Sequence, residues 1–171
     1  MDIHEAIRNP HNLTCDRLAA FCRHVDLALD EQTIRSLPLT GIVKTCGNNR
    51  LTCLDCLCDC IGVYAFQLRG CVIYVGKCGG GQQNLKERVR QHLTVGDKKG
   101  GTLPQAWLRK YGHNHDPDNQ KAAYKAEIVQ SCLWTIAFRR DEDMQKIARL
   151  EHLLIGVIGP EYCDMSATLL Q

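Results

Sequence analysis

Two short runs rich in β-branched and aromatic residues, at 60–66 and 71–75, constrain the fold of this 171-residue chain most strongly. Residues of these types favour strands, and the Arg69-Gly70 pair between the runs is typical of a tight turn. The sequence therefore predicts a β-hairpin at about 60–76.

Two tyrosines sit on this hairpin: Tyr64 ends a Gly-Val-Tyr triplet and Tyr74 begins a Tyr-Val-Gly triplet. Side chains alternate between the two faces of a strand, so the register decides whether the tyrosines meet. A two-residue turn would set Tyr64 opposite Val75 and leave the tyrosines on opposite faces. A shared site requires a three-residue turn or a bulge, which we expect near 69–71 with Gly70 in the left-handed conformation.

The remaining patterns predict helices and one further strand. Apolar residues at helical spacing predict that residues 1–37 are helical. Further helices are expected at 84–93, 104–111 and 141–158. An apolar run within 124–139 predicts a strand that pairs with the hairpin.

These elements predict an α+β fold within the broad α/β class. The expected core is a small antiparallel sheet of about three strands flanked by helices. Three parts follow one another: a helical N-terminal extension at 1–41, a cysteine-rich connector at 42–60, and the domain carrying the hairpin at 61–171. Apolar residues make up 44% of the chain, which is enough for a core.

Neither a membrane partner nor export is expected from the sequence. No apolar run approaches the ~20 residues needed to cross a bilayer. The first residues contain no basic stretch followed by an apolar one, so no secretory signal is visible. We therefore expect an intracellular protein, cytoplasmic or associated with the nucleoid.

Charge is distributed unevenly along the chain. Residues 1–60 hold 6 Lys and Arg against 8 Asp and Glu, a net charge of −2. Residues 77–140 hold 12 against 5, a net charge of +7, and residues 141–171 hold 2 against 6, a net charge of −4. A basic excess just after the hairpin suits a nucleic-acid backbone, although a solvated basic face is an equal alternative.

Glu151 lies on the apolar stripe of the predicted 141–158 helix, between Ile147 and Leu154. Burying an ionised carboxylate is costly unless it is paired or bound to a metal. The pattern therefore favours a metal ligand, and the alternative is an edge position paired with an arginine. Mg²⁺ keeps most of its waters and needs few protein carboxylates, so one glutamate suffices.

The predicted 84–93 helix begins at Asn84, a candidate N-cap with Glu87 three residues later. Arg88 and His92 are four residues apart, so they share a face. The apolar residues of the helix are expected to form an opposite, buried stripe. The guanidinium of an arginine such as Arg88 holds phosphate oxygens with two parallel hydrogen bonds. The alternative for both Arg88 and His92 is a position exposed to solvent.

In this order, the two tyrosine triplets, the arginine helix and the late helical glutamate resemble the GIY-YIG nucleases. The resemblance spans about residues 60–165 and implies a metal-dependent DNA endonuclease that uses Mg²⁺ or Mn²⁺. Members act in restriction, repair, homing or phage-related processes. Many carry an asparagine after the glutamate helix, but here none follows Asn119, and Asp164 and Ser166 are the candidate replacements.

The resemblance also implies roles for individual residues. Glu151 would hold the metal, Arg88 would stabilise the transition state, and His92 would donate to a phosphate or relay a proton. One tyrosine, Tyr64 more than Tyr74, would orient or deprotonate the attacking water. A phenol with a pKa of about 10 is a poor base at neutral pH and needs nearby positive charge.

Contacts with the DNA backbone are expected from basic residues around the same elements. Lys77 directly follows the second triplet, as in the branch related to excision-repair nucleases. The other candidates are Lys86, Arg90, Lys98 and Lys99. A lone site cuts one strand at a time, so cutting both would need a homodimer or two sequential nicks.

Eleven cysteines form a second notable feature. Because the number is odd and no export signal is visible, reduced thiols or a metal are better explanations than a disulfide framework. Cys53 and Cys56 form a candidate zinc half-site that Cys46 with Cys58 or Cys60 would complete. Alternatively, the alternation at 56, 58 and 60 is one buried face of a strand.

Three functions are compatible with these patterns. The first is the metal-dependent endonuclease. The second is a nucleic-acid-binding module that keeps the fold without cutting, with zinc as a structural element. The third is a structural or partner-binding protein that uses the N-terminal helices, which the basic window disfavours.

Overall fold

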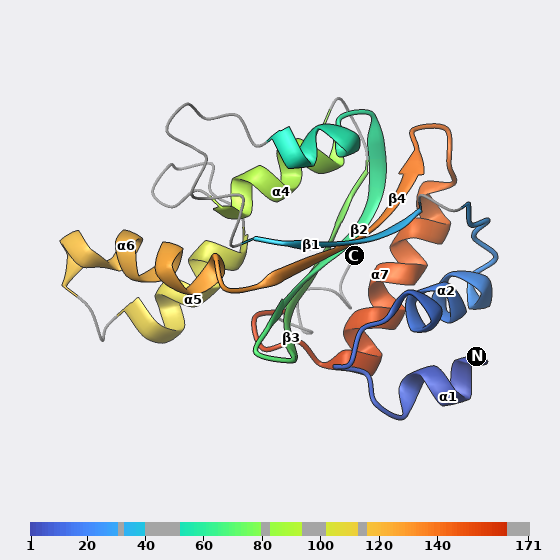
Figure 1. Ribbon diagram of the computed structural model, residues 1–171, viewed down its shortest axis with the longest axis horizontal. Helices are drawn as coiled ribbons and strands as arrows, with labels where there is room; N and C mark the ends of the chain where they lie inside the picture. Colours follow the sequence, from blue (N-terminus) through green and yellow to red (C-terminus); the bar gives the residue numbers. More distant parts are fainter. Residues whose placement is uncertain (31–32, 40–51, 80–82, 94–101, 113–115, 164–171) are drawn as a thin grey trace.

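The computed structural model describes residues 1–30, 33–39, 52–79, 83–93, 102–112 and 116–163. It contains a four-stranded antiparallel sheet flanked by helices, which confirms the α+β class (Figure 1). The strands are β1 (Ile34–Pro38), β2 (Cys60–Leu68), β3 (Cys71–Cys78) and β4 (Cys132–Arg139), in the spatial order β1-β4-β2-β3.

Helices cover both faces of the sheet. On one face lie α1 (Ile3–Ile7), α2 (Cys15–His24) and α7 (Met144–Ile158). On the other lie the 3-10 helix η2 (Thr52–Leu57), α4 (Leu85–Leu93), α5 (Thr102–Tyr111) and α6 (Pro117–Ile128). Side chains of β2 alternate between the layers, with Val63 and Ala65 in the first core and Tyr64 and Phe66 in the second.

Figure 1 shows α5 and α6 extending together away from the sheet. Tyr124 and Ile128, four residues apart on α6, are buried, and the Tyr124 ring meets Trp107 of α5 edge to face. Within the described ranges, no helix is long and apolar enough to cross a membrane.

The segment at 34–38 corrects the prediction that residues 1–37 are helical. It forms β1, which pairs with β4 in a register that sets Ile34 opposite Ile136. The helical stripe of α2 ends at His24, and Pro38 is tolerated because β1 is an edge strand and Pro38 is its last residue. The sheet therefore has one strand more than expected, contributed by the N-terminal part of the chain.

The other predicted elements are found with shifted boundaries. The helices expected at 84–93, 104–111 and 141–158 are α4, α5 and α7. The strand expected within 124–139 begins only at Cys132, because the residues up to Ile128 belong to α6. Periodicity misassigned this segment since short apolar runs suit both a helix and a strand.

The hairpin joins β2 and β3 through a two-residue turn. Arg69 and Gly70 have φ angles of 51° and 82°, as a turn with two left-handed residues requires. The left-handed conformation expected for Gly70 is thus confirmed, whereas the longer turn is not found.

The bulge needed to bring the tyrosines together lies further along β3 than predicted. Phe66 pairs with Tyr74 but Gln67 pairs with Val72, so Ile73 is the extra residue. An extra residue on one strand reverses the facing of everything beyond it. Tyr74 consequently lies on the same face of the sheet as Tyr64 and Phe66.

The bulge is fastened by the segment between α1 and α2. The Val72 backbone N–H donates to Nδ1 of His11 at 3.2 Å, and Gln67 Nε2 donates to the His11 carbonyl at 2.6 Å. Trp134 of β4 donates from Nε1 to Gln67 Oε1 at 2.9 Å. Polar groups displaced by the bulge therefore have partners, which a buried irregularity in a sheet requires.

We predict that His11→Ala lowers the free energy of unfolding by about 1–2 kcal/mol, because the amide of buried Val72 loses its acceptor. Urea unfolding followed by circular dichroism measures the change. The exposed neighbour Asn12, changed to Ala, serves as the control and should leave stability within about 0.5 kcal/mol. Equal effects of the two substitutions would contradict a role for His11 at the bulge.

Candidate functional site

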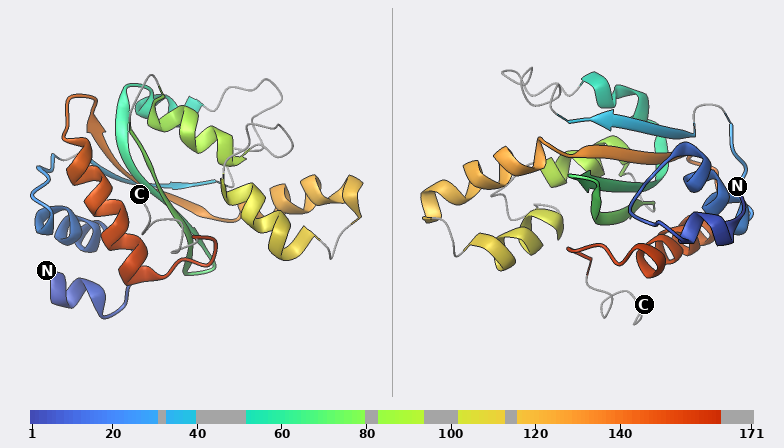
Figure 2. Two further views of the ribbon diagram at one scale, coloured as in Figure 1. Left: turned by 180° about the vertical axis from the view of Figure 1, so that it is seen from behind. Right: turned by 60° about the horizontal axis from the view of Figure 1, so that its bottom comes forward.

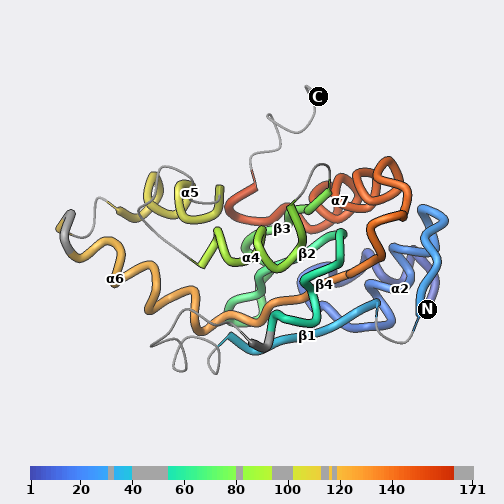
Figure 3. Tube along the Cα trace, turned by 90° about the horizontal axis from the view of Figure 1, so that it is seen from above, coloured from blue at the N-terminus to red at the C-terminus, as the bar shows by residue number. Residues whose placement is uncertain are grey.

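A cavity of about 660 Å³ lies at the outer edge of β3, the last strand of the described sheet. Its walls come from β3, α4 and α7, which lie along one side of the molecule in the rear view of Figure 2 and in Figure 3. The lining residues are Tyr74, Gly76, Lys77, Cys78, Gly79, Gln83, Arg88, Ala148, Glu151 and His152. Because β3 is an edge strand, side chains from both of its faces reach the cavity.

The segment after α7 covers the first part of this edge. The Tyr162 N–H donates to the Ile73 carbonyl at 2.9 Å, and the Val75 N–H donates to Cys163 Sγ at 3.3 Å. The backbone N–H and C=O groups on the outer side of this edge strand therefore have hydrogen-bond partners there. The cavity opens beside the next residues of the strand, at 76–79.

Glu151 is ion-paired with Lys77 at the cavity wall, with 2.7 Å between Oε2 and Nζ. The Glu151 side chain is 12% exposed, so its carboxylate is held largely out of water. We expected this carboxylate to be paired or bound to a metal. In the structure it is paired, and its partner is a lysine instead of the arginine that the alternative named. With Arg88 contributed by α4, the lining carries two cations and one carboxylate.

Burial, more than nearby charge, governs the acidity of the two tyrosines. Tyr64 is 1% exposed, and burial raises the pKa of its phenol well above the usual value. Burial also raises the pKa of Tyr74, and the Arg88 guanidinium offsets only part of either effect. Both phenols are therefore protonated at neutral pH, which suits hydrogen-bond donation better than action as a base.

The tyrosine rings lie close together, with centroids 6.1 Å apart, and only Tyr74 lines the cavity. Gly76 makes this packing possible. A Cβ at that position would lie 2.7 Å from Tyr64 Oη and 2.9 Å from Tyr74 Cε1. Gly62 is constrained by its backbone, because it has a φ of +147° and a Cβ there would lie 2.0 Å from the Ile136 carbonyl oxygen.

We predict that Gly76→Ala destabilises the protein by about 1–3 kcal/mol, because the added methyl group must push the tyrosines apart. Gly156→Ala in α7 is the matched control, since a Cβ there meets nothing within 4 Å. This control should stabilise the helix by about 0.5–1 kcal/mol. Thermal unfolding compares the two, and a harmless Gly76→Ala would contradict the close packing.

His92 departs from its predicted placement. The sequence placed it with Arg88 on the face of α4 opposite the buried stripe, whereas the structure buries it completely. Nε2 lies 2.5 Å from Tyr64 Oη, and Nδ1 accepts the Leu103 N–H at 3.3 Å. The reason is that α4 lies between the sheet and α5, so two of its faces are covered.

Burial lowers the pKa of His92 to about 3, with a smaller contribution from Arg88, so this imidazole is neutral at physiological pH. Above pH 6.5 the side chain is neutral in both the folded and the unfolded chain and contributes no pH dependence. As the pH falls below 6.5 the unfolded chain takes up a proton that the folded protein refuses. Stability is therefore lost on acidification.

We predict that this loss reaches at most about 1.4 kcal/mol per pH unit between pH 6.5 and about 3. Comparing urea unfolding of the wild type and His92→Gln across this range isolates the contribution, because other titrating groups are common to both proteins. A difference between them that does not change with pH would show that His92 has the same pKa in the folded protein as in the unfolded chain, which would contradict the lowering of its pKa by burial.

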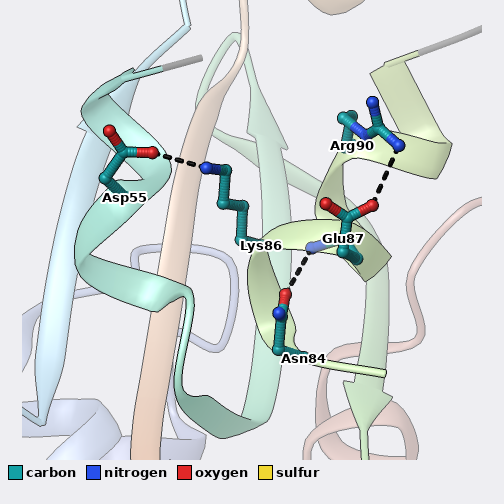
Figure 4. A network of polar contacts seen from close by, with 5 residues as sticks. All are labelled: Asp55, Asn84, Lys86, Glu87 and Arg90. Atoms are coloured by element: carbon teal, nitrogen blue, oxygen red, sulfur yellow. Dashed lines mark hydrogen bonds and ion pairs between the residues drawn. The ribbon is translucent and has the colours of Figure 1, made fainter. Parts of the chain in front are cut away.

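Lys86 and Arg90, predicted to contact DNA, are not in the cavity lining and have carboxylate partners (Figure 4). Lys86 Nζ pairs with Asp55 of η2 at 2.5 Å, and Arg90 Nη2 pairs with Glu87 at 2.9 Å. Asn84 caps α4 as predicted, accepting the Glu87 N–H at 2.8 Å. Lys98 and Lys99 lie outside the described residues.

The zinc hypothesis stays a prediction. Cys46 and the side chain of Cys53 lie outside the described part of the chain. Within that part no three His, Cys, Asp or Glu side chains gather as a structural zinc site would require. The alternative, that Cys56, Cys58 and Cys60 lie on one face of a strand, is wrong. Cys56 belongs to η2, Cys58 belongs to a turn, and Cys60 is the first residue of β2.

Sequence reasoning missed two polar side chains near the site, Thr102 and Cys78. The Thr102 hydroxyl is hydrogen-bonded to Tyr74 Oη, and Cys78 lines the cavity. Thr102 follows Gly100-Gly101, two residues before the helix predicted at 104–111, and nothing there indicates a contact with the hairpin. Only the folded chain brings α5 against β3.

Comparisons of the chain with protein-family models, with curated proteins and with solved structures give no match. The assignment of a function therefore depends on the residues that line the cavity, on their surroundings, and on the sequence resemblance.

Proposed function

We propose that this protein is a metal-dependent endonuclease that hydrolyses DNA phosphodiesters in the cavity at the edge of β3. The observation that carries the proposal is the convergence of Tyr74, Lys77, Arg88 and Glu151 on one cavity. These residues come from three separate elements, β3, α4 and α7. They are also residues that the resemblance to GIY-YIG nucleases implies.

The cavity has the chemistry of a phosphate site. Lys77 and Arg88 supply positive charge, and Arg88 offers two parallel N–H donors to phosphate oxygens. Tyr74 adds a neutral donor, because its phenol keeps its proton. In hydrolysis, negative charge grows on the phosphate oxygens, so fixed donors and cations stabilise the transition state more than the substrate.

Glu151 fits a divalent metal. Its carboxylate is mostly buried at the cavity wall, and Mg²⁺ or Mn²⁺ needs few protein ligands when phosphates and waters complete its shell. Such an ion supplies Lewis acidity and a more acidic bound water. Lys77 would then turn from the carboxylate to a phosphate, so the observed ion pair holds Glu151 in place before the substrate arrives.

Water activation separates this proposal from its alternative, a nucleic-acid-binding module that does not cut. Both phenols have raised pKa values, so neither Tyr64 nor Tyr74 is prepared to accept a proton. A metal held by Glu151 would therefore have to supply the activation of the attacking water, while Tyr74, Lys77 and Arg88 bind and orient the phosphate. If no ion binds, the same cavity still holds a phosphate without cleaving it.

Binding to DNA follows the charge of the chain. The basic window at 77–140 includes the cavity cations and the flanking residues Lys86 and Arg90. Their surface ion pairs contribute little and exchange readily for phosphates. On this basis we place the protein inside the cell. Cleavage of both DNA strands would need a homodimer or two sequential nicks.

The deciding experiment is cleavage of supercoiled plasmid with Mg²⁺ or Mn²⁺. Wild type should nick or linearise the plasmid only with metal, and Glu151→Gln should cut at least about a hundredfold more slowly. Glu87→Gln is the matched control, because it removes an exposed carboxylate of α4 and should cut at the wild-type rate.

Three results would count against the nuclease. Cutting by Glu151→Gln at the wild-type rate would remove its proposed ligand. A folded wild type that binds but never cuts plasmid, branched or single-stranded DNA would favour the non-cutting module. A protein that neither binds nor cuts any of them would contradict both.

A further inference from the structure

The first turn of α5 contacts two polar side chains of the site. The Thr102 hydroxyl is hydrogen-bonded to Oη of Tyr74, and the next residue, Leu103, donates its backbone N–H to Nδ1 of His92. In the rear view of Figure 2, α5 faces the viewer together with α4 and α7, and in Figure 3 all of these and β3 lie in the upper half of the view. One helical turn thus touches both β3 and α4 from outside the hairpin.

The contact with Leu103 fixes which nitrogen of His92 carries the proton. A backbone amide donates only, so Nδ1 must be the acceptor and the neutral ring must be protonated at Nε2. Nε2 lies 2.5 Å from Tyr64 Oη, and its N–H therefore donates to that oxygen. The imidazole is completely buried, with Arg88 nearby, which disfavours the doubly protonated form.

The direction of the hydrogen bonds continues to Tyr64. Since Tyr64 Oη accepts from His92, its own proton is available to a further acceptor. The ring of Tyr74 lies beside it, with the two ring centroids 6.1 Å apart.

Thr102 acts on Tyr74. Its hydroxyl is hydrogen-bonded to Tyr74 Oη, and either oxygen of this pair can donate. A phosphate only accepts, so when one binds in the cavity it takes the phenol proton and the Thr102 hydroxyl donates to Tyr74 Oη. Tyr74 is the tyrosine that lines the cavity, so that proton is placed to meet a ligand there.

We propose that the first turn of α5 positions the site: the Thr102 hydroxyl holds the Tyr74 phenol so that it donates to a bound phosphate, and the Leu103 amide orients His92 toward Tyr64. Thr102 is a positioning residue, because it acts through Tyr74. The inference rests on the proposed nuclease for the identity of the ligand. The orientation of His92 between the Leu103 amide and Tyr64 does not depend on catalysis.

Thr102→Val and Thr102→Ser form the matched pair that tests the positioning role. Valine keeps the shape of the side chain without the hydroxyl, whereas serine keeps the hydroxyl. In single-turnover cleavage with Mg²⁺ we expect Thr102→Val to be slowed about tenfold and Thr102→Ser to stay within about twofold of wild type. The Kd for DNA should change less than the rate constant in both variants.

Two outcomes would overturn the role of Thr102. Thr102→Val cutting as fast as wild type would show that the hydroxyl is dispensable. Equal losses in both variants, with unchanged unfolding temperatures, would show that the hydroxyl is not the group that matters.

The tautomer of His92 tests the direction of its hydrogen bonds to Leu103 and Tyr64, and the test needs no nuclease activity. In ¹⁵N NMR of the wild-type protein, His92 should show a protonated Nε2 and an unprotonated Nδ1 from pH 8 to pH 5. Its signals are assigned by their absence in His92→Gln. A proton on Nδ1 would overturn the inference even if plasmid is cut, and the expected tautomer would support it even if plasmid is not cut.

Discussion

The extra residue in β3 is the constraint on which the rest of the structure depends. With a two-residue turn, an unbulged hairpin would send Tyr64 and Tyr74 to opposite faces of the sheet. The bulge at Ile73 brings Tyr74 onto the α4 face, and His11 holds the bulge through the amide of Val72. The N-terminal segment therefore contributes to the register that assembles the cavity, although it lies on the opposite layer.

Much of the fold could be predicted from the sequence because local signals agreed with the final packing. The hairpin, the helix capped by Asn84 and the 141–158 helix each had clear periodicity and boundary residues. Two segments could not be predicted correctly. The residues of β1 carry little strand signal and depend on pairing with β4. The residues up to Ile128 belong to α6, whose Tyr124 packs against Trp107 of α5.

The site was predictable in its charged residues but not in its buried ones. A carboxylate on an apolar stripe, Glu151, and an arginine on a basic helix both lie at the cavity, and Lys77 of β3 pairs with Glu151 of α7. The burial of His92 was not predictable, since it depends on α5 covering α4. The contact between Thr102 and Tyr74 was equally hidden, because a lone threonine at a helix start has no sequence signal for a distant partner.

The most direct test of the cavity as a phosphodiester site is a crystal structure of the protein with a short DNA duplex and Mn²⁺. We expect a backbone phosphate within hydrogen-bonding distance of Arg88 and Tyr74, and anomalous density from Mn²⁺ beside the Glu151 carboxylate. Lys77 should have turned from Glu151 toward the phosphate. DNA bound on another face, with the Lys77–Glu151 pair intact and no Mn²⁺ at the cavity, would contradict the assignment of this site.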